Sequence, residues 1–236
     1  MSTEVDSRVV WVVRHADRLD FADPAWAASA THPYDPPLSP LGTRQARALA
    51  ARLSTEAIAH LFSSPFLRCV ESALAIARTH GLCVKIEDGL SEWLNVGWFR
   101  NAPELQPVAE LAARYVQVDT AYSSRGQARF GESGEEAIRR SATTCLRLAN
   151  DFEGNLLLVA HGASVLGSLT GLIGQSAVKG AFADAPYCSL SKVIRPAGGN
   201  WRLAYAGDVS HLPRISGPAQ YRGCTDGDDA KVDIRG

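Results

Sequence analysis

The chain has 236 residues, 46% of them hydrophobic and 21% charged, and a formal net charge of −1. This composition is typical of a globular protein that can bury a core, and it gives no support to binding of nucleic acid or of an anionic membrane surface. No apolar run is long enough to span a bilayer, and the acidic, polar N-terminus is unlike a signal peptide. The five cysteines are widely spaced and odd in number, which argues against a disulfide framework and favours the cytoplasm.

The first predicted element is a strand over residues 8–14, an apolar and largely β-branched run typical of a buried strand in a parallel sheet. It is followed by His15, Ala16, Asp17 and Arg18. Ligands of open α/β sheets bind beyond the carboxyl ends of the strands, so Arg14, His15 and Arg18 are candidate site residues. The alternative is a solvated turn after the strand.

Residues from Leu19 to about Pro40 form a predicted loop, because five prolines in this stretch rule out regular structure. A loop of this length is either a lid or binding wall, or a surface insertion. Ser39 then suits the N-cap of a helix with Pro40 at its first position, and apolar residues at helical spacing extend this helix to Leu53.

A second strand is predicted over residues 58–63, followed by a helix that ends at His80. Ser64 is expected to cap this helix, with Pro65 at the first position. Arg68 then lies in the first turn, beyond the carboxyl end of a strand. A helix N-terminus with an arginine beside it is a candidate anion site.

A third strand is predicted over residues 82–87, and Glu92 follows it among Trp93, Trp98 and Phe99. A carboxyl group in apolar surroundings has a raised pKa and can act as a general acid. The alternative is an ordinary loop glutamate. The three aromatic residues could form the wall of a pocket for an apolar leaving group, or part of the core.

The second half of the chain predicts a helix over about 103–117 and another that opens with a capping box and runs to residue 152. The strand over residues 156–160 is the most apolar in the chain and therefore central. It ends at His161, ahead of a helix that reaches Ile173. Residues 188–195 and 201–205 read as a hairpin that adds antiparallel strands. We expect a single domain over residues 1–236, with loose tails at 1–7 and from about 211 to 236.

The polar residues at these strand ends can converge, because the carboxyl ends of parallel strands share one edge of the sheet. Guanidinium groups clamp a phosphate through paired hydrogen bonds. A neutral histidine held by a backbone carbonyl can attack phosphorus, and a second histidine can stabilise the transferring group. A protonated glutamate can then donate to the leaving oxygen.

Five segments resemble motifs of the histidine phosphatase superfamily, which includes the cofactor-dependent phosphoglycerate mutases. They occur in the family's order between about residues 8 and 195. Each match alone is weak, but together they are specific. The segments are Arg14-His15-Ala16 for Arg-His-Gly, Leu38-Ser39-Pro40-Leu41-Gly42-Thr43-Arg44-Gln45-Ala46 for Leu-Thr-x-x-Gly-x-x-Gln-Ala, Ser63-Ser64-Pro65-Phe66-Leu67-Arg68-Cys69 for Ser-Ser-Pro-x-x-Arg-Ala, Gly131-Glu132-Ser133 for Gly-Glu-Ser, and Val159-Ala160-His161-Gly162 for Val-Ser-His-Gly.

The resemblance implies a three-layer α/β/α sandwich with a mostly parallel central sheet and an antiparallel edge. It implies that His15 is the phosphorylated nucleophile, that Arg14, Arg68 and His161 complete the phosphate pocket, and that Glu92 is the proton donor. No metal and no cofactor are implied.

Two details resemble one branch, the suppressor-of-T-cell-receptor-signalling and ecdysteroid-phosphate phosphatases. Arg18 extends the first motif in the manner of that branch and would join the phosphate-binding residues. Residues 89–93 resemble its Gly-Leu-x-Glu-Trp, where the mutases carry Glu-Arg-His-Tyr-Gly after the glutamate. Two positions depart from the branch: Ala16 replaces a glycine and Asp17 replaces a glutamate.

The sequence therefore predicts a metal-independent phosphomonoester hydrolase of the histidine acid phosphatase type, acting on a small phosphate ester or a phosphoprotein. A phosphoglycerate mutase and a phosphate-binding module without catalysis are the alternatives. A metal hydrolase has least support, because His15 and Asp17 have no third and fourth ligand at suitable spacing. The physiological substrate is left open, as is the oligomeric state, for which a homodimer is one alternative.

Overall fold

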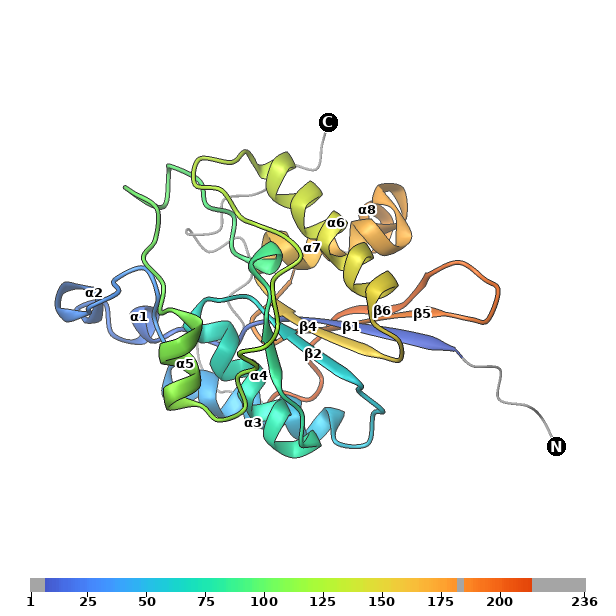
Figure 1. Ribbon diagram of the computed structural model, residues 1–236, viewed down its shortest axis with the longest axis horizontal. Coiled ribbons are helices and arrows are strands. Elements are labelled where there is room, and N and C mark those ends of the chain that lie inside the picture. The colour runs from blue at the N-terminus through green and yellow to red at the C-terminus, as the bar shows by residue number, and fades with distance from the viewer. Residues whose placement is uncertain (1–6, 182–184, 214–236) are drawn as a thin grey trace.

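The computed structural model describes residues 7–181 and 185–213, which form three layers around one mixed sheet (Figure 1). The six strands lie in the order β3-β2-β4-β1-β5-β6. The pairs among β1 to β4 are parallel, whereas β5 pairs with β1 and β6 in antiparallel fashion. The predicted sandwich with an antiparallel edge is thus confirmed. The strands are β1 (Arg8–Arg14), β2 (His60–Ser63), β3 (Val84–Ile86), β4 (Leu156–Ala160), β5 (Leu190–Arg195) and β6 (Arg202–Asp208).

Helices cover both faces of the sheet (Figure 1). The residues of α3 and α4 pack in one hydrophobic cluster with Trp11 and Val13, and those of α6 and α7 pack in a second with Val10 and Val12. This division follows from the alternation of side chains along β1, whose apolar residues all lie in the core. The helices are α1 (Leu19–Ala22), α2 (Trp26–Ser29), α3 (Pro40–Leu53), α4 (Leu67–His80), α5 (Val108–Arg114), α6 (Gly134–Asp151), α7 (Gly162–Ile173) and α8 (Gln175–Ala181), with a 3-10 turn η1 (Asp88–Leu90).

Three sequence predictions about local structure are wrong. The stretch from Leu19 to Pro40 contains α1 and α2, because its prolines flank these short helices and do not interrupt them. The helix expected over 103–117 is limited to α5. Helix α4 begins at Leu67 with Phe66 as its N-cap, and Ser64 does not cap it. By contrast, the cap at Ser39 and the capping box at the start of α6 are confirmed.

A tight junction fixes the chain immediately after β1. Ser39 Oγ accepts from the Gly42 N–H at 2.9 Å and donates to Asp17 Oδ2 at 2.6 Å. A Cβ atom on Gly42 would lie 2.1 Å from the Asp17 carbonyl oxygen, so only glycine permits this approach. The N-terminus of α3 therefore holds the segment that follows His15.

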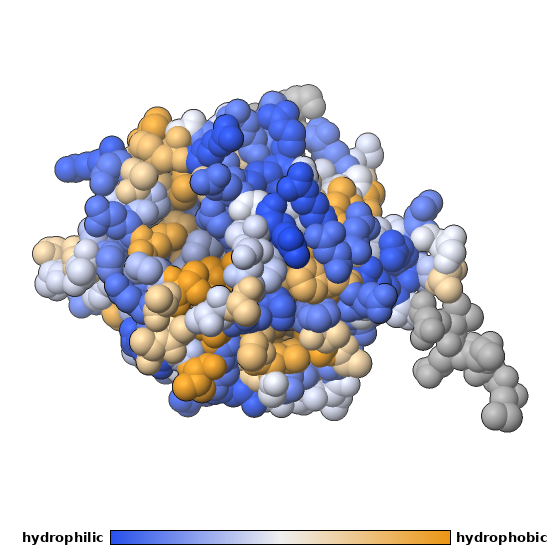
Figure 2. Space-filling model, viewed as in Figure 1, coloured by the Kyte–Doolittle hydropathy of each residue, from blue (hydrophilic) through white to orange (hydrophobic). Residues whose placement is uncertain are grey.

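The outer face shown in Figure 2 mixes hydrophilic and hydrophobic residues. Among the described helices, none has the length and apolar character needed to cross a membrane. Of the four cysteines in the described part, Cys83 is exposed and the other three are buried, and all four are free thiols. At the end of the described part, Leu212 is buried and His211 contacts the Cys188 carbonyl. Residues 1–6 and 214–236, which hold most of both predicted tails, lie outside the described residues.

Candidate active site

Two histidines from neighbouring strands meet at the carboxyl edge of the sheet. His15 follows β1 and His161 follows β4, and the His15 N–H donates to the Ala160 carbonyl at 2.9 Å, continuing the parallel ladder. Their ring centroids are 5.1 Å apart. Adjacency of the two strands thus brings together side chains that are 146 positions apart in sequence.

The His15 ring is oriented by the backbone. Its Nδ1 lies 2.8 Å from the Ala16 carbonyl oxygen, which can only accept a hydrogen bond, so Nδ1 carries the proton. The Nε2 lone pair then faces the interior of the site, where Arg68 Nε donates to it at 3.3 Å. Burial and the charge of Arg68 hold the pKa of His15 well below its usual value. The imidazole is therefore neutral and nucleophilic near pH 7.

Arg68 lies among all the other polar groups of the site. Its Nη2 is 3.3 Å from His161 Nδ1 and 3.4 Å from Glu92 Oε2. Its side chain is almost fully buried, and Nη1 has no hydrogen-bond partner among the residues that the structure describes. A buried donor without a partner is rare and costly, and an oxyanion in the site would satisfy it.

His161 is the N-cap residue of α7 and is fully buried. Its Nε2 lies 2.8 Å from Ser64 Oγ, and its Nδ1 lies 3.1 Å from Glu92 Oε2. Burial, followed by the charge of Arg68, holds the pKa of His161 well below its usual value. The second imidazole is neutral for the same physical reasons as the first.

Glu92 enters the site from the segment after η1. Its side chain is 4% exposed and ends between Arg68 and His161, and its other oxygen accepts the Trp93 N–H at 3.0 Å. The predicted convergence of His15, His161, Arg68 and Glu92 is therefore what the structure shows. Their chemical roles, and the proton on Glu92, stay predictions.

The other two predicted arginines are differently placed. Arg14 is buried, donates to the Ala185 carbonyl at 2.7 Å and lies over the Tyr187 ring at 4.0 Å. Arg18 is partly exposed, pairs with Asp20 at 2.6 Å and lies over the ring of Phe21. Both guanidinium groups also help to lower the pKa of His161, so both contribute positive potential to the site.

Three groups that could ligate a metal meet here, although the sequence offered no third and fourth ligand at suitable spacing beside His15 and Asp17. Donor atoms of His15, Glu92 and His161 all lie within 4.8 Å of one another. Asp17, the other ligand considered from the sequence, bonds Ser39 instead. Two histidines and a carboxylate suit a zinc ion, but the Arg68 guanidinium points a donor at each of the three residues. Its charge opposes a cation there and favours an anion.

Sequence reasoning missed two contributors to this site. Ser64 was assigned to a helix cap but contacts His161, and the Ser-Ser-Pro motif was the available signal. Tyr187 lies 5.2 Å from the His15 ring by centroids, and Phe21 lies 6.4 Å from Tyr187. No motif marked Tyr187. Of the aromatic residues that were considered for a pocket wall, Phe99 belongs to a buried cluster and is core.

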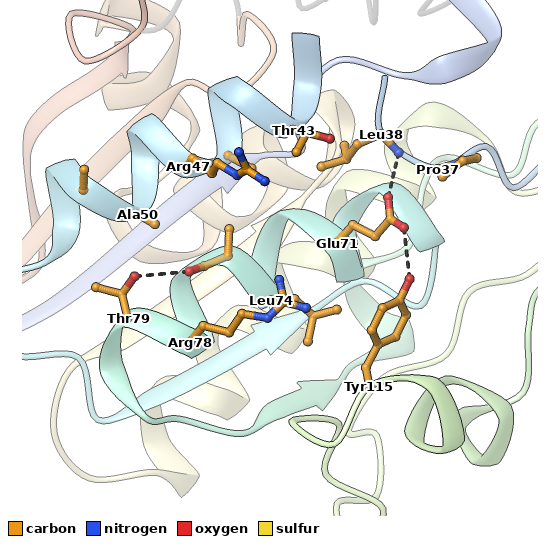
Figure 3. Close-up of a pocket in the computed structure, with 13 residues that line it drawn as sticks. Pro37, Leu38, Thr43, Arg47, Ala50, Glu71, Leu74, Arg78, Thr79 and Tyr115 are labelled. Atoms are coloured by element: carbon orange, nitrogen blue, oxygen red, sulfur yellow. Dashed lines mark hydrogen bonds between the residues drawn. The ribbon is translucent and has the colours of Figure 1, made fainter. Parts of the chain in front are cut away.

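A separate hollow lies between α3 and α4, with a volume of about 670 Å³ and a lining that excludes all the predicted site residues. In Figure 3, Glu71 stands at one end of this hollow, between the backbone of Leu38 and the Tyr115 side chain. The Leu38 N–H and the Tyr115 hydroxyl donate to it at 2.8 and 3.0 Å. Because Leu38 forms a β-bridge with Arg18, Glu71 supports the segment next to the site.

The model of the histidine phosphatase superfamily (branch 1) matches residues 10–209, and the chain belongs to this superfamily. A probable phosphoglycerate mutase, GpmB, of Yersinia pseudotuberculosis is 31% identical over 214 residues, covering 86% of this chain and 94% of that protein. The ecdysteroid-phosphate phosphatase of Drosophila melanogaster is 25% identical over 245 residues, covering 86% of this chain. The chain spans only 32% of that fly protein's length.

Solved structures show the same fold. The ecdysone phosphate phosphatase from Bombix mori, determined with tungstate, aligns with a TM-score of 0.72 at 22% identity, over 91% of this chain and 97% of that one. A phosphoserine phosphatase from Entamoeba histolytica aligns with a TM-score of 0.59 at 19% identity, over 87% and 100%. The branch suggested by the sequence motifs is thus represented among both sets of relatives.

Proposed function

We propose that this chain is a phosphomonoester hydrolase that works through a phosphohistidine on His15 and needs no metal. The observation that supports this most directly is a neutral, carbonyl-oriented His15 beside the buried Nη1 of Arg68, which has no hydrogen-bond partner within residues 7–181 and 185–213. The first is suited to attack phosphorus, and the second is suited to donate to a phosphate oxygen. Both face the same buried site.

In the proposed first step, the Nε2 lone pair of His15 forms a bond to phosphorus while the bond to the leaving oxygen breaks. Glu92 gives its proton to that oxygen, so the alcohol leaves neutral. Arg68 and His161 stabilise the transferring phosphoryl group, with further positive potential from Arg14 and Arg18.

In the second step, water attacks phosphorus and the N–P bond breaks. The Glu92 carboxylate takes a proton from the water, which restores both the acid and the free imidazole. Inorganic phosphate is the second product. A single carboxyl thus serves first as acid and then as base.

The test is phosphate release from p-nitrophenyl phosphate in EDTA, with His15→Ala as the critical variant. His80→Ala is the matched control, because His80 ends α4 and has no part in the proposed chemistry. We expect turnover in EDTA, full activity of the control and loss of turnover in His15→Ala. An acid-labile, alkali-stable phosphoryl group should be trapped on the parent protein. Turnover by His15→Ala would overturn the proposal.

Phosphoglycerate mutase activity is the second candidate, because GpmB is 31% identical and is matched over nearly its whole length. It would use the same phosphohistidine for transfer between hydroxyl groups. A requirement for a bisphosphorylated primer, with isomerisation faster than hydrolysis, would favour it. Phosphate binding without any trapped phosphohistidine would instead favour a module without catalysis.

The leaving group that we propose has an aromatic or otherwise apolar surface. The buried Tyr187 ring lies beside the His15 ring, and the partly exposed Phe21 ring lies beside Tyr187. Aromatic rings pack favourably against flat apolar groups. The names of the fly and silkworm relatives specify ecdysteroid phosphate and ecdysone phosphate as what those proteins act on. A panel of sugar, nucleotide, aryl and steroid phosphates tests this, and a preference for sugar phosphates would contradict it.

A further inference from the structure

We propose that Arg140 is a positioning residue for Glu92, acting with Glu132 through the backbone on either side of that carboxylate. This inference rests on the proposed role of Glu92 as proton donor. It concerns a residue outside the His15 cluster, on helix α6, whose guanidinium contacts the backbone of the segment bearing Glu92.

The Arg140 guanidinium has five N–H donors, and the described structure supplies an acceptor for each. Nε and Nη2 donate to the two carboxylate oxygens of Glu132 at 3.0 and 2.5 Å. Nη1 donates to the carbonyls of Gly89 and Ser91 at 2.9 and 3.2 Å, and Nη2 also donates to the Glu92 carbonyl at 3.1 Å. Three of the five bonds therefore fix the backbone of the segment from Gly89 to Glu92, two of them at Ser91 and Glu92 themselves.

Glu132 completes the clamp on the other side of Glu92. Its Oε1 also accepts the Leu94 N–H at 3.4 Å, and its carbonyl accepts the Trp93 indole N–H at 2.7 Å. Ser164 in the first turn of α7 adds a bond to the Ser91 carbonyl at 2.6 Å. The main chain is thus held before, at and after the residue that carries the carboxylate.

The ion pair between Arg140 and Glu132 is buried, with the two side chains 8% and 6% exposed. A buried ion pair is weak grounds for expecting stability, because desolvation offsets its attraction and an apolar pair would often do as well. What an apolar pair could not supply is donors for three carbonyls arranged along one segment. Catalytic groups must be held to within a fraction of an ångström, so the clamp suits a role in placing the Glu92 carboxylate.

The expected consequence is specific to the leaving group. A proton donor matters most when the departing oxygen is a strong base, and little when it is stabilised as an anion. Loss of alignment should therefore reduce kcat/KM for phenyl phosphate far more than for p-nitrophenyl phosphate. The ratio kcat/KM is the right quantity, because it covers the steps up to departure of the alcohol and excludes hydrolysis of the phosphohistidine.

Four variants make the test. Glu92→Gln sets the reference, with an expected loss of about 100-fold or more for phenyl phosphate and about tenfold or less for p-nitrophenyl phosphate. Arg140→Lys keeps the charge but cannot make five directed bonds, and Glu132→Gln keeps one acceptor and the shape. For both, the loss for phenyl phosphate should exceed the loss for p-nitrophenyl phosphate by about fivefold or more. Arg139 is the exposed neighbour of Arg140 on α6, so Arg139→Lys should leave kcat/KM unchanged for both substrates.

The outcomes separate the inference from the function that it rests on. Suppose that Glu92→Gln loses more kcat/KM for phenyl phosphate than for p-nitrophenyl phosphate. If Arg140→Lys and Glu132→Gln then lose kcat/KM equally for the two substrates, or lose none, the positioning role of Arg140 is overturned. Equal losses in Glu92→Gln would show that Glu92 is not the donor, which overturns the proposed acid step and the inference with it. Glu132→Gln is the milder change and keeps the test valid if Arg140→Lys does not fold.

Discussion

Asp35 is a buried carboxylate whose titration should be visible in the stability of the whole protein. It is 2% exposed, and its Oδ1 accepts the Leu67 N–H at 2.7 Å where α4 begins. Its Oδ2 has no hydrogen-bond partner among the described residues. Burial raises the pKa of Asp35 from its ordinary 3.8 to about 6, with the Leu67 hydrogen bond acting in the opposite direction. The folded protein therefore binds this proton more tightly than the unfolded chain does.

The sign and size of the effect follow from that difference. Well below pH 3.8, Asp35 is protonated in both states and contributes no pH dependence. Between about pH 4 and 6 the unfolded chain loses the proton first, so the free energy of unfolding falls as pH rises. The difference between 3.8 and about 6 corresponds to a loss of about 3 kcal/mol, complete somewhat above pH 6.

Asp35→Asn is the matched variant, because the amide keeps an acceptor for the Leu67 N–H and cannot ionise. Urea unfolding of both proteins at pH 4 to 8, followed by tryptophan fluorescence, gives the difference in unfolding free energy at each pH. Titrations of other groups cancel in that difference. We expect Asp35→Asn to gain on the parent by about 2–3 kcal/mol between pH 4 and 7. A difference that is constant over this range, or that changes in the opposite direction, would refute the reasoning.

Three further predictions concern the junction after β1 and the two histidines. Gly42→Ala should lower the free energy of unfolding by about 1–3 kcal/mol, measured with urea, because its Cβ would clash with the Asp17 carbonyl; an unchanged midpoint would contradict this. Ser64→Ala should reduce kcat/KM by about five- to tenfold by removing the hydrogen bond to His161, while Ser64→Thr keeps more activity; equal rates for the two variants would count against that bond. The pKa values of His15 and His161 are both lowered, so the acid limb of the pH profile of kcat/KM should lie well below pH 6.5 once ionisation of the substrate is corrected for. A loss of activity centred at pH 6.5 would argue against the buried, neutral pair of histidines.

The site could be predicted from the sequence where a motif marks the end of a strand. His15 and His161 each end an apolar run, and parallel pairing brings such ends to one edge of the sheet. The central place of β4 followed in the same way from its uninterrupted apolar run. These inferences use only the periodicity and the polarity of short segments, which the sequence contains in full.

The supporting contacts could not be predicted, because they depend on tertiary packing across the chain. The sequence suggested Ser64 as the cap of α4, but the Leu67 N–H at the start of this helix bonds Asp35. Asp35 lies in the loop between α2 and α3, and no local sequence pattern indicates that this loop contacts α4. In the sequence, Arg140 is one of several charged residues on an amphipathic helix, and no motif distinguishes it from the others. Tyr187 lies next to His15 because the turn before β5 brings it there, 172 positions along the chain. No motif indicated that Arg18 pairs with Asp20 two positions away, and its role in binding phosphate stays a prediction.

The hydrogen bond between His15 and Ala160 ties the width of the reaction centre to the sheet itself. The ring centroids are 5.1 Å apart, close to the spacing of about 4.8 Å between neighbouring strands. Separating the two strands to admit a larger electrophile would break the central ladder of the domain. In the proposed hydrolase, variation therefore falls on the alcohol side, where loops such as those bearing Phe21 and Tyr187 can change without disturbing the strands.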